Sequence, residues 1–249
     1  MFSLKDVAKS FGSLQVLQPT TVDFREGEST VLIGPSGCGK STLLRMLVGL
    51  TPADSGTIHF DGMPVGPQNI LELRQKMGYV IQDGGLFPHL TSRENICLLA
   101  KHLGWNESRL KHRVDELADL TRLSPVALER YPNQISGGQR QRVGMMRALM
   151  LDPKVILLDE PMGALDPLVR FDLQEDLRKI FRSLKKTTIL VTHDMGEASF
   201  FGDRVLMLSE GKIVQEGSLL DLIHNPSSEY VAKFINAQRI HTDDRSETA

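Results

Sequence analysis

Hydrophobic residues in this chain occur in two arrangements, as short continuous runs and as residues repeated at helical spacing. The continuous runs have the length of strands and cover Ser29–Ile33, Val155–Asp159 and Thr188–Thr192. Runs of this kind are typical of strands that are buried on both faces. Helical patterns cover Ser41–Val48, about Gln139–Met150 and Pro167–Leu184. The alternation of the two predicts an α/β fold, in which helices cover both faces of a largely parallel sheet.

Two further regions depart from this alternation. Short strands are predicted at Phe2–Val7, Thr21–Phe24 and Thr57–Phe60, the last followed by an Asp61-Gly62 turn, and they indicate an N-terminal antiparallel β subdomain. Between about residues 91 and 135 the pattern is helical, with a capping box at Thr91 and Glu94. We therefore expect one domain over residues 1–239 with an inserted α-helical subdomain, and a polar tail over residues 240–249.

Composition excludes several classes of protein. The 249 residues are 41% hydrophobic and 24% charged, as in ordinary globular proteins. A net charge of −2 argues against a nucleic-acid surface, which needs a basic excess. No apolar run approaches the roughly 18 residues of a membrane span, and charge comes too early after Met1 for a signal peptide. The expectation is a soluble, cytosolic protein whose two cysteines form neither a disulfide nor a zinc site.

One segment matches the phosphate-binding pattern G-x-x-x-x-G-K-[ST] at every fixed position. It consists of Gly34, Pro35, Ser36, Gly37, Cys38, Gly39, Lys40, Ser41 and Thr42. In such loops, glycines let backbone N–H groups wrap phosphate oxygens, the lysine reaches the β- and γ-phosphates, and the first hydroxyl ligates Mg²⁺. A strand precedes the segment and a helix follows it, which is the context that the motif requires.

Two residues near this loop allow alternative interpretations. The positive environment of the loop could lower the pKa of the Cys38 thiol, although a small residue that simply fits is the more ordinary interpretation. Phe11 could stack on an adenine ring through its face, or it could be a core aromatic residue. The sequence leaves both questions open.

A second candidate phosphate site is Ser136-Gly137-Gly138-Gln139. Its two glycines remove the side chains between Ser136 and Gln139, so backbone N–H groups at the start of the following helix can approach an anion closely. This segment forms only half of a phosphate site. Together with the upstream loop it indicates ATP, and a dimer in which the two halves meet.

Four polar residues follow predicted strands. Asp159 is expected to hold Mg²⁺, and Glu160 to orient or deprotonate the attacking water. Gln82 begins a glycine-containing loop, and its amide oxygen can meet Mg²⁺ or water without adding charge. His193 is a candidate phosphate contact because ligands bind at the strand ends of open α/β sheets.

With these pieces in order, the chain resembles the nucleotide-binding subunits of ABC transporters over nearly its whole length. In that family's terms, Gly34–Thr42 resembles the Walker A loop, Gln82 the Q-loop residue, and Ser136–Gln139 the signature. Val155–Glu160 resembles the Walker B strand, Ala164-Leu165-Asp166 the D-loop, His193 the switch histidine and Phe11 the adenine-stacking aromatic. Ile135 is a small departure, since leucine commonly precedes the signature serine.

The resemblance implies an ATPase that uses ATP and Mg²⁺, with Glu160, His193 and Gln82 at the catalytic centre and Ser41, Gln82 and Asp159 as metal ligands. It implies a head-to-tail homodimer in which the Ser136 segment of one subunit covers ATP on the Lys40 loop of the other. Membrane-spanning permease subunits would dock in a groove beside Gln82–Pro88, and an extracytoplasmic solute-binding protein would act indirectly. The subunit would then lie peripherally on the cytoplasmic face of the cell membrane.

Several segments further resemble importers of quaternary amines and osmoprotectants such as glycine betaine or choline. They are Gly78–Gln82, Gly85–His89, Leu103–Trp105 and Arg130–Pro132. The alternatives are an importer cassette for another solute such as an amino acid, an anion or a polyamine, an export cassette, and a non-transport ABC ATPase. A cassette that binds ATP without hydrolysis is disfavoured by the presence of Glu160 and His193.

Overall fold

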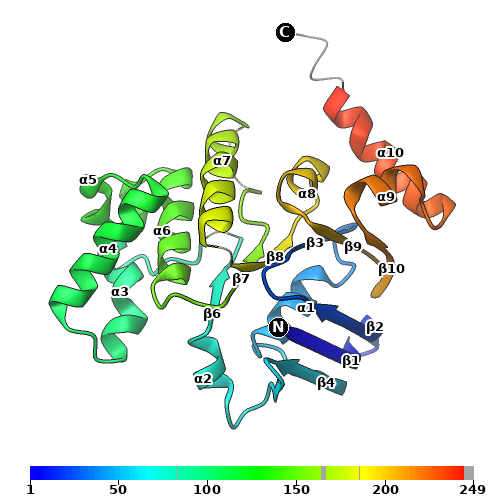
Figure 1. The fold of residues 1–249 in the computed structure, drawn as a ribbon, viewed down its shortest axis with the longest axis horizontal. Coiled ribbons are helices and arrows are strands. Elements are labelled where there is room, and N and C mark those ends of the chain that lie inside the picture. The colour runs from blue at the N-terminus through cyan, green and yellow to red at the C-terminus, as the bar shows by residue number, and fades with distance from the viewer. Residues whose placement is uncertain (83, 164–166, 185, 244–249) are drawn as a thin grey trace. The chain divides into compact units, whose positions relative to one another are not determined.

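The computed structural model describes residues 1–82, 84–163, 167–184 and 186–243. The chain divides into two compact units (Figure 1), one formed by Met1–Ile70 with Ile189–Ala249 and the other by Leu71–Thr188. The predicted phosphate loop, Phe11 and His193 belong to the first unit. Gln82, the Ser136 segment, Asp159 and Glu160 belong to the second unit. The two units are described separately.

The first unit begins with a four-stranded antiparallel sheet in the order β2-β1-β4-β5. Its strands are β1 (Phe2–Phe11), β2 (Leu14–Phe24), β4 (Ser55–Phe60) and β5 (Met63–Pro64). The predicted antiparallel subdomain is therefore confirmed, although β1 and β2 are longer than expected. Their pairing contains shifts of register, and buried and exposed residues do not alternate regularly along either strand. The hydrophobic pattern therefore indicated only part of each strand.

The same unit contains a second set of strands in the order β10-β9-β3-β8. These are β3 (Ser29–Ile33), β8 (Thr187–Val191), which starts at the unit boundary, β9 (Arg204–Ser209) and β10 (Lys212–Gly217). Strands β3 and β9 are parallel, whereas β9 and β10 form an antiparallel pair joined through Glu210 and Gly211. The helices of this unit are α1 (Lys40–Leu47), α8 (Met195–Phe201), α9 (Leu219–His224) and α10 (Glu229–Asp243).

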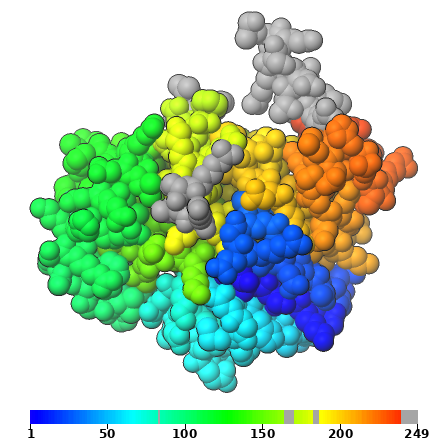
Figure 2. Space-filling model, in the orientation of Figure 1, coloured from blue at the N-terminus to red at the C-terminus, as the bar shows by residue number. Residues whose placement is uncertain are grey.

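The second unit contains the parallel strands β6 (Met77–Val80) and β7 (Val155–Asp159), with every residue of β7 buried. Its helices are α2 (Ile70–Arg74), α3 (Ser92–His102), α4 (Glu107–Thr121), α5 (Pro125–Leu128), α6 (Gly137–Leu149) and α7 (Pro167–Leu184), with the 3₁₀ turn η1 (Pro132–Gln134). Helices α3 to α5 form the predicted helical insertion, which is green in Figure 2. The predicted capping box at Thr91 and Glu94 is confirmed, and the Asn106 side chain caps α4.

The predicted α/β class, with its antiparallel subdomain and helical insertion, is thus confirmed. Strand β8 begins one residue earlier than predicted, and β9 and β10 complete a pairing that the sequence interpretation did not include. Helix α10 continues through Asp243, so the first four residues of the expected tail, 240–243, are helical. Residues 244–249 lie outside the described chain. Within the described residues, none of the helices combines the length and hydropathy that a bilayer crossing requires.

Candidate functional site

The loop between β3 and α1 is shaped by glycines that no other residue can replace without strain. Gly34 has a φ of 143°, and a Cβ added there would lie 2.1 Å from the carbonyl oxygen of Leu208. Gly39 has a φ of 108°, and its added Cβ would lie 2.7 Å from the carbonyl oxygen of Val16. Both close approaches are to backbone atoms of paired strands, which cannot move aside easily. The glycine positions of the motif are therefore required by this chain's own packing.

Lys40 is held by the loop that it follows. Its side-chain Nζ donates to the carbonyl oxygens of Gly34 at 2.8 Å and Pro35 at 2.9 Å, and the residue is only 5% exposed. A buried ammonium group is costly unless it is paired with acceptors. Here the two carbonyls supply that pairing. A phosphate would offer the same group a full negative charge, which is a stronger acceptor than a neutral carbonyl.

Cys38 fits the more ordinary of its two interpretations. Burial raises the pKa of the Cys38 thiol, and the opposing charge of Lys40 does not overcome it. The expectation that the loop could lower this pKa is therefore wrong. The sulfur lies 3.0 Å from the position that a Gly34 Cβ would occupy, so Cys38 fills space inside the loop as a packing residue. Cys38 and Cys97 are both free thiols.

Phe11 is not a core residue, because 53% of its surface is exposed at the end of β1. The ammonium group of Lys9 lies 5.3 Å from the centre of the Phe11 ring, a cation–π distance. Lys9 itself pairs with Asp54 at 2.6 Å. The exposed ring is compatible with the stacking interpretation, and the core interpretation is excluded.

His193 follows β8. This strand lies beside β3, which leads into the phosphate loop. The backbone N–H of Thr192, the residue before His193, donates to the carbonyl oxygen of Leu32, two residues before Gly34, at 3.1 Å. The chain therefore leaves β8 and β3 at the same edge of the sheet. His193 is exposed there, and Asp194 caps α8 by accepting from the N–H groups of Gly196 and Glu197.

In the second unit, Gln82 and Glu160 come together although 78 residues separate them. The side-chain amide of Gln82 donates to the carboxylate of Glu160, with 3.5 Å between Nε2 and Oε2. Glu160 has a φ of 46°, an uncommon value for a residue with a side chain, and the N–H of Gly163 closes the turn on its carbonyl oxygen at 3.3 Å. Strained conformations of this kind concentrate at functional sites.

Asp159 ends β7 and is 5% exposed, with the hydroxyl of Tyr79 donating to its carboxylate at 3.4 Å. The predicted metal ligands Ser41, Gln82 and Asp159 offer a hydroxyl, an amide and a carboxylate oxygen. Such hard oxygen donors suit Mg²⁺, which takes one or two carboxylates together with substrate phosphates. The described residues contain no group of three or more His, Cys, Asp or Glu able to hold a metal ion.

The Ser136 segment forms the N-terminus of α6. The Ser136 hydroxyl accepts from the N–H of Gln139 at 3.2 Å, and the Gln139 side chain accepts from the N–H of Ser136 at 3.0 Å, a complete capping box. Ser136 is exposed, Gly137 is half-buried and Gly138 is buried. The methionines at 145, 146 and 150 are buried.

Sequence reasoning missed two residues of α6 that contact the loop after β6. Gln141 donates to the carbonyl oxygen of Gln82, and Arg147 donates to the carbonyl oxygens of Gly84 and Gly85. Their partners are backbone atoms about sixty residues away, which no local pattern reveals. The residues Ala164, Leu165 and Asp166, predicted as the D-loop, and Asp83 lie outside the described residues.

Comparison with known proteins finds one family model, described as "ABC transporter", which matches residues 17–163. The chain is 45% identical to the glycine betaine/carnitine/choline transport ATP-binding protein OpuCA of Bacillus subtilis (strain 168), over 96% of this chain and 63% of that protein. It is 44% identical to the sulfate/thiosulfate import ATP-binding protein CysA 2 of Agrobacterium fabrum, over 95% of this chain and 70% of that protein. The chain therefore spans less than two thirds of the length of OpuCA.

Among solved structures, the chain is similar to the ATP-binding cassette MJ0796, in a dimeric post-hydrolysis state bound to ADP and Pi. The TM-score is 0.79 at 33% sequence identity, and the match covers 88% of this chain and 99% of that one. The same α/β architecture therefore accommodates a nucleotide in a related protein.

Proposed function

Because this chain belongs to the ABC transporter family, we propose that it is the nucleotide-binding subunit of an importer and hydrolyses ATP to drive solute uptake. The observation that carries this proposal is the pairing of Gln82 with Glu160 at the end of β7, since it presents a carboxylate in a strained turn directly after the buried Asp159. The glycine-built loop before α1 provides the phosphate cradle.

ATP binding uses residues of the first unit. The loop Gly34–Thr42 wraps the phosphates with backbone N–H groups, and Lys40 exchanges its two carbonyl acceptors for phosphate oxygens. The exposed ring of Phe11 stacks on adenine. His193 reaches the terminal phosphate from the end of β8.

Hydrolysis uses Glu160 as the base that accepts a proton from the attacking water. Gln82 donates to the Glu160 carboxylate through its amide nitrogen, so its amide oxygen would be the atom that meets the metal. Mg²⁺ held by Ser41, Gln82 and Asp159 would supply positive charge at the β- and γ-phosphates. The buried carboxylate of Asp159 keeps its orientation through Tyr79.

A head-to-tail homodimer completes the site. The N-terminus of α6 is exposed at Ser136, where a second copy of the chain can reach it. Its Gly137-Gly138 backbone and Ser136 hydroxyl would cover the γ-phosphate bound to a second copy. The dimeric state of the similar MJ0796 cassette supports this arrangement.

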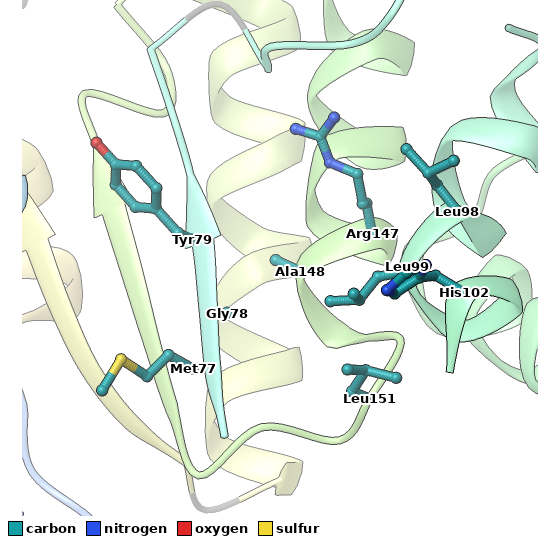
Figure 3. Close-up of a pocket in the computed structure, with 9 residues that line it drawn as sticks. All are labelled: Met77, Gly78, Tyr79, Leu98, Leu99, His102, Arg147, Ala148 and Leu151. Atoms are coloured by element: carbon teal, nitrogen blue, oxygen red, sulfur yellow. The ribbon is translucent and has the colours of Figure 1, made fainter. Parts of the chain in front are cut away.

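Permease subunits would dock in a cavity of about 410 Å³ within the second unit. The expected groove lay beside Gln82–Pro88, whereas the described lining of this cavity includes none of those residues and reaches them only through Arg147, which donates to Gly84 and Gly85. Figure 3 shows β6 on one side of it and α3 on the other, with α6 between them; the labelled residues are Met77, Gly78, Tyr79, Leu98, Leu99, His102, Arg147, Ala148 and Leu151. Leu98 and Leu99 are 43% and 44% exposed, so both offer apolar surface to a partner segment. Docking to such subunits would hold the chain at the cytoplasmic face of the membrane.

The solute is proposed to be an osmoprotectant such as glycine betaine or choline, received through an extracytoplasmic binding protein. The relative OpuCA supports this choice, and the nearly equal identity to CysA 2 keeps an anion as the second candidate. Selectivity lies in the partner chains, so uptake assays of the assembled complex with betaines, amino acids and anions distinguish the two. Stimulation of ATPase activity only by an anion would refute the osmoprotectant proposal and leave the ATPase proposal standing.

The catalytic proposal is tested with Glu160→Gln. This change removes the base and preserves the shape of the residue and the phosphate loop, so ATP affinity should stay within about threefold and turnover should fall about 10²–10⁴-fold. Steady-state release of phosphate and equilibrium binding of a fluorescent ATP analogue measure the two quantities. Asp203→Asn is the matched control, because this carboxylate in the first unit accepts only from the backbone N–H of Ser29 among its described contacts. Turnover of Glu160→Gln within threefold of wild type would contradict the role of Glu160.

A further inference from the structure

Helix α6 contacts the backbone of the loop after β6 through three residues, which are Gln141, Arg147 and Gly144. The Gln141 side chain donates from Nε2 to the carbonyl oxygen of Gln82 at 2.8 Å. Arg147 donates from its two terminal nitrogens to the carbonyl oxygens of Gly85 and Gly84, both at 2.7 Å. Hydrogen bonds from a charged donor are stronger than neutral ones. This loop is therefore attached to α6 more firmly than an ordinary surface loop.

The third contact is a close packing of two glycines. A Cβ added to Gly144 would lie 3.4 Å from both the Cα and the carbonyl oxygen of Gly84. Residues 141, 144 and 147 are spaced three apart and share one face of the helix. One face of α6 is thus devoted to the loop, and its middle position has no side chain that would keep the backbones apart.

The side-chain amide of Gln141 uses its donor but not its acceptor in the described hydrogen bonds. Gln141 is only 6% exposed, and its Oε1 has no hydrogen-bond partner among the described residues. This oxygen lies 3.9 Å from where a Gly84 Cβ would be, so it faces the loop. A buried amide that satisfies only its donor side costs free energy. A small shift of the loop that brought an N–H group to this oxygen would recover that free energy.

The loop in turn contacts the base. Gln82, whose carbonyl oxygen is held by Gln141, donates its own side-chain amide to Glu160 at 3.5 Å. Contacts therefore run from α6 to the backbone of Gln82, Gly84 and Gly85, and from the Gln82 side chain to the Glu160 carboxylate. The N-terminus of the same helix is the Ser136 segment.

Arg147 also faces the cavity beside α3. Its side chain lines that cavity, and the burial of its guanidinium lowers its pKa. Among the described ion pairs, none joins Arg147 to a carboxylate, and the two loop carbonyls are its described acceptors. A segment that enters the cavity would therefore touch the residue that holds the loop.

We propose that Gln141 and Arg147 are positioning residues for hydrolysis, which hold the backbone at Gln82, Gly84 and Gly85 against α6 and thereby set the position of Gln82 against Glu160. The inference rests on the proposed function, because it assigns Glu160 the role of base. Gln141 holds the carbonyl oxygen of Gln82 itself, Arg147 holds those of the two glycines, and both act on Glu160 through Gln82.

A double-mutant cycle of Arg147→Met and Gln82→Ala tests this assignment in the full chain. If Arg147 acts through Gln82, Arg147→Met should lower kcat about tenfold in the wild-type background and less than about twofold in the Gln82→Ala background. The affinity for a fluorescent ATP analogue should be unchanged in all variants, since the phosphate loop is untouched. Gln141→Leu should behave in the same way, with a smaller loss of about threefold.

Arg113→Met is the matched control. Arg113 also donates from its guanidinium to a backbone carbonyl of this region, that of Leu149, at 2.8 Å, but it does not contact the loop. Its effect on kcat should be the same with and without Gln82→Ala. A loss at Arg147→Met that is equally large in the Gln82→Ala background, or wild-type kcat in Arg147→Met, would overturn the inference.

Hydrogen exchange separates this inference from the proposed function. In the nucleotide-free chain, Arg147→Met should accelerate exchange of the amides of residues 84–87 about tenfold, and Arg113→Met should not. This result supports the inference even if the wild-type chain fails to hydrolyse ATP, an outcome that would count against the proposed function. Unchanged exchange in Arg147→Met would overturn the inference even if the chain is an active ATPase.

Discussion

Two helices of this chain begin with glycine-containing segments suited to anions, and they begin differently. At α1, the residue before the helix is Gly39 in a left-handed conformation, and no side chain caps the helix. At α6, Ser136 and Gln139 form a complete capping box. An uncapped helix N-terminus leaves its first N–H groups for a ligand, whereas a capping box satisfies part of them within the chain.

The difference suggests different tasks for the two segments. The α1 loop has the shape of a phosphate-binding loop. Its glycines Gly34 and Gly39 pack against backbone atoms, and the Lys40 ammonium group is held by a carbonyl oxygen of the loop. The α6 segment is stable without a ligand and presents an exposed serine hydroxyl on its surface. We interpret the α1 loop as the segment that binds the nucleotide. We interpret the α6 segment as one that covers a nucleotide bound to another subunit.

The largest effect is expected from Gly34→Ala. The added methyl group would meet the carbonyl oxygen of Leu208 at 2.1 Å, on a backbone whose φ is already unfavourable for alanine. Overpacking and strain of this kind cost about 1–3 kcal/mol each, so ATP affinity should fall about a hundredfold or more. Titration with a fluorescent ATP analogue measures it. Gly62→Ala, at a φ of 76° with nothing within 4 Å, controls for backbone strain alone and should bind ATP as wild type does. Binding by Gly34→Ala within threefold of wild type would show that the loop tolerates a different shape.

A smaller effect is expected from Ser136→Ala. Loss of the cap should lower the free energy of unfolding by about 1 kcal/mol. Loss of a hydroxyl that donates to a charged phosphate should lower ATP turnover about tenfold, with unchanged nucleotide affinity of the separate chain. Ser218→Ala removes an equivalent capping box, formed with Asp221 at α9, and should lose similar stability without losing turnover. Equal turnover of Ser136→Ala and Ser218→Ala would mean that the Ser136 hydroxyl acts only as a helix cap.

The smallest effect is expected from Phe11→Ala, which removes the exposed ring at the end of β1. Stacking of a base on an aromatic ring contributes about 1–3 kcal/mol, and for an exposed ring we expect the lower end, about 1–1.4 kcal/mol. ATP affinity should therefore fall about fivefold to tenfold, and Phe11→Tyr should preserve it. Isothermal titration calorimetry measures the difference. Equal ATP affinity of Phe11→Ala and wild type would mean that the adenine does not stack there.

The sequence predicted best those elements whose packing is uniform. The bounds of β3 and β7 were predicted to the residue, because both are nearly continuous buried runs between polar or glycine-rich segments. Strands β9 and β10 were not predicted, although Glu210-Gly211 repeats the turn signal of Asp61-Gly62, with positive φ at both residues of each pair. The β9–β10 hairpin could therefore have been predicted from the same kind of turn signal.

The site was predictable as a list of residues and not as a set of contacts. Motif spacing identified Lys40, Glu160 and Gln82 because phosphate chemistry requires those residue types at those positions. It did not reveal the carbonyl partners of Lys40, nor Gln141 and Arg147, since a side chain that binds a distant backbone carbonyl leaves no signature in the sequence of its partner. The roles of the site residues remain predictions that the experiments above address.

The central claim is that the α1 loop and the α6 segment complete each other only between subunits. Mixing Lys40→Ala with Ser136→Arg chains tests it most directly, because each mixed dimer contains one site built from the two wild-type halves and one site with both defects. We predict that each variant alone is inactive and that phosphate release recovers in part when the two are mixed and allowed to exchange subunits. Activity of Ser136→Arg as a pure and demonstrably monomeric chain would contradict the claim.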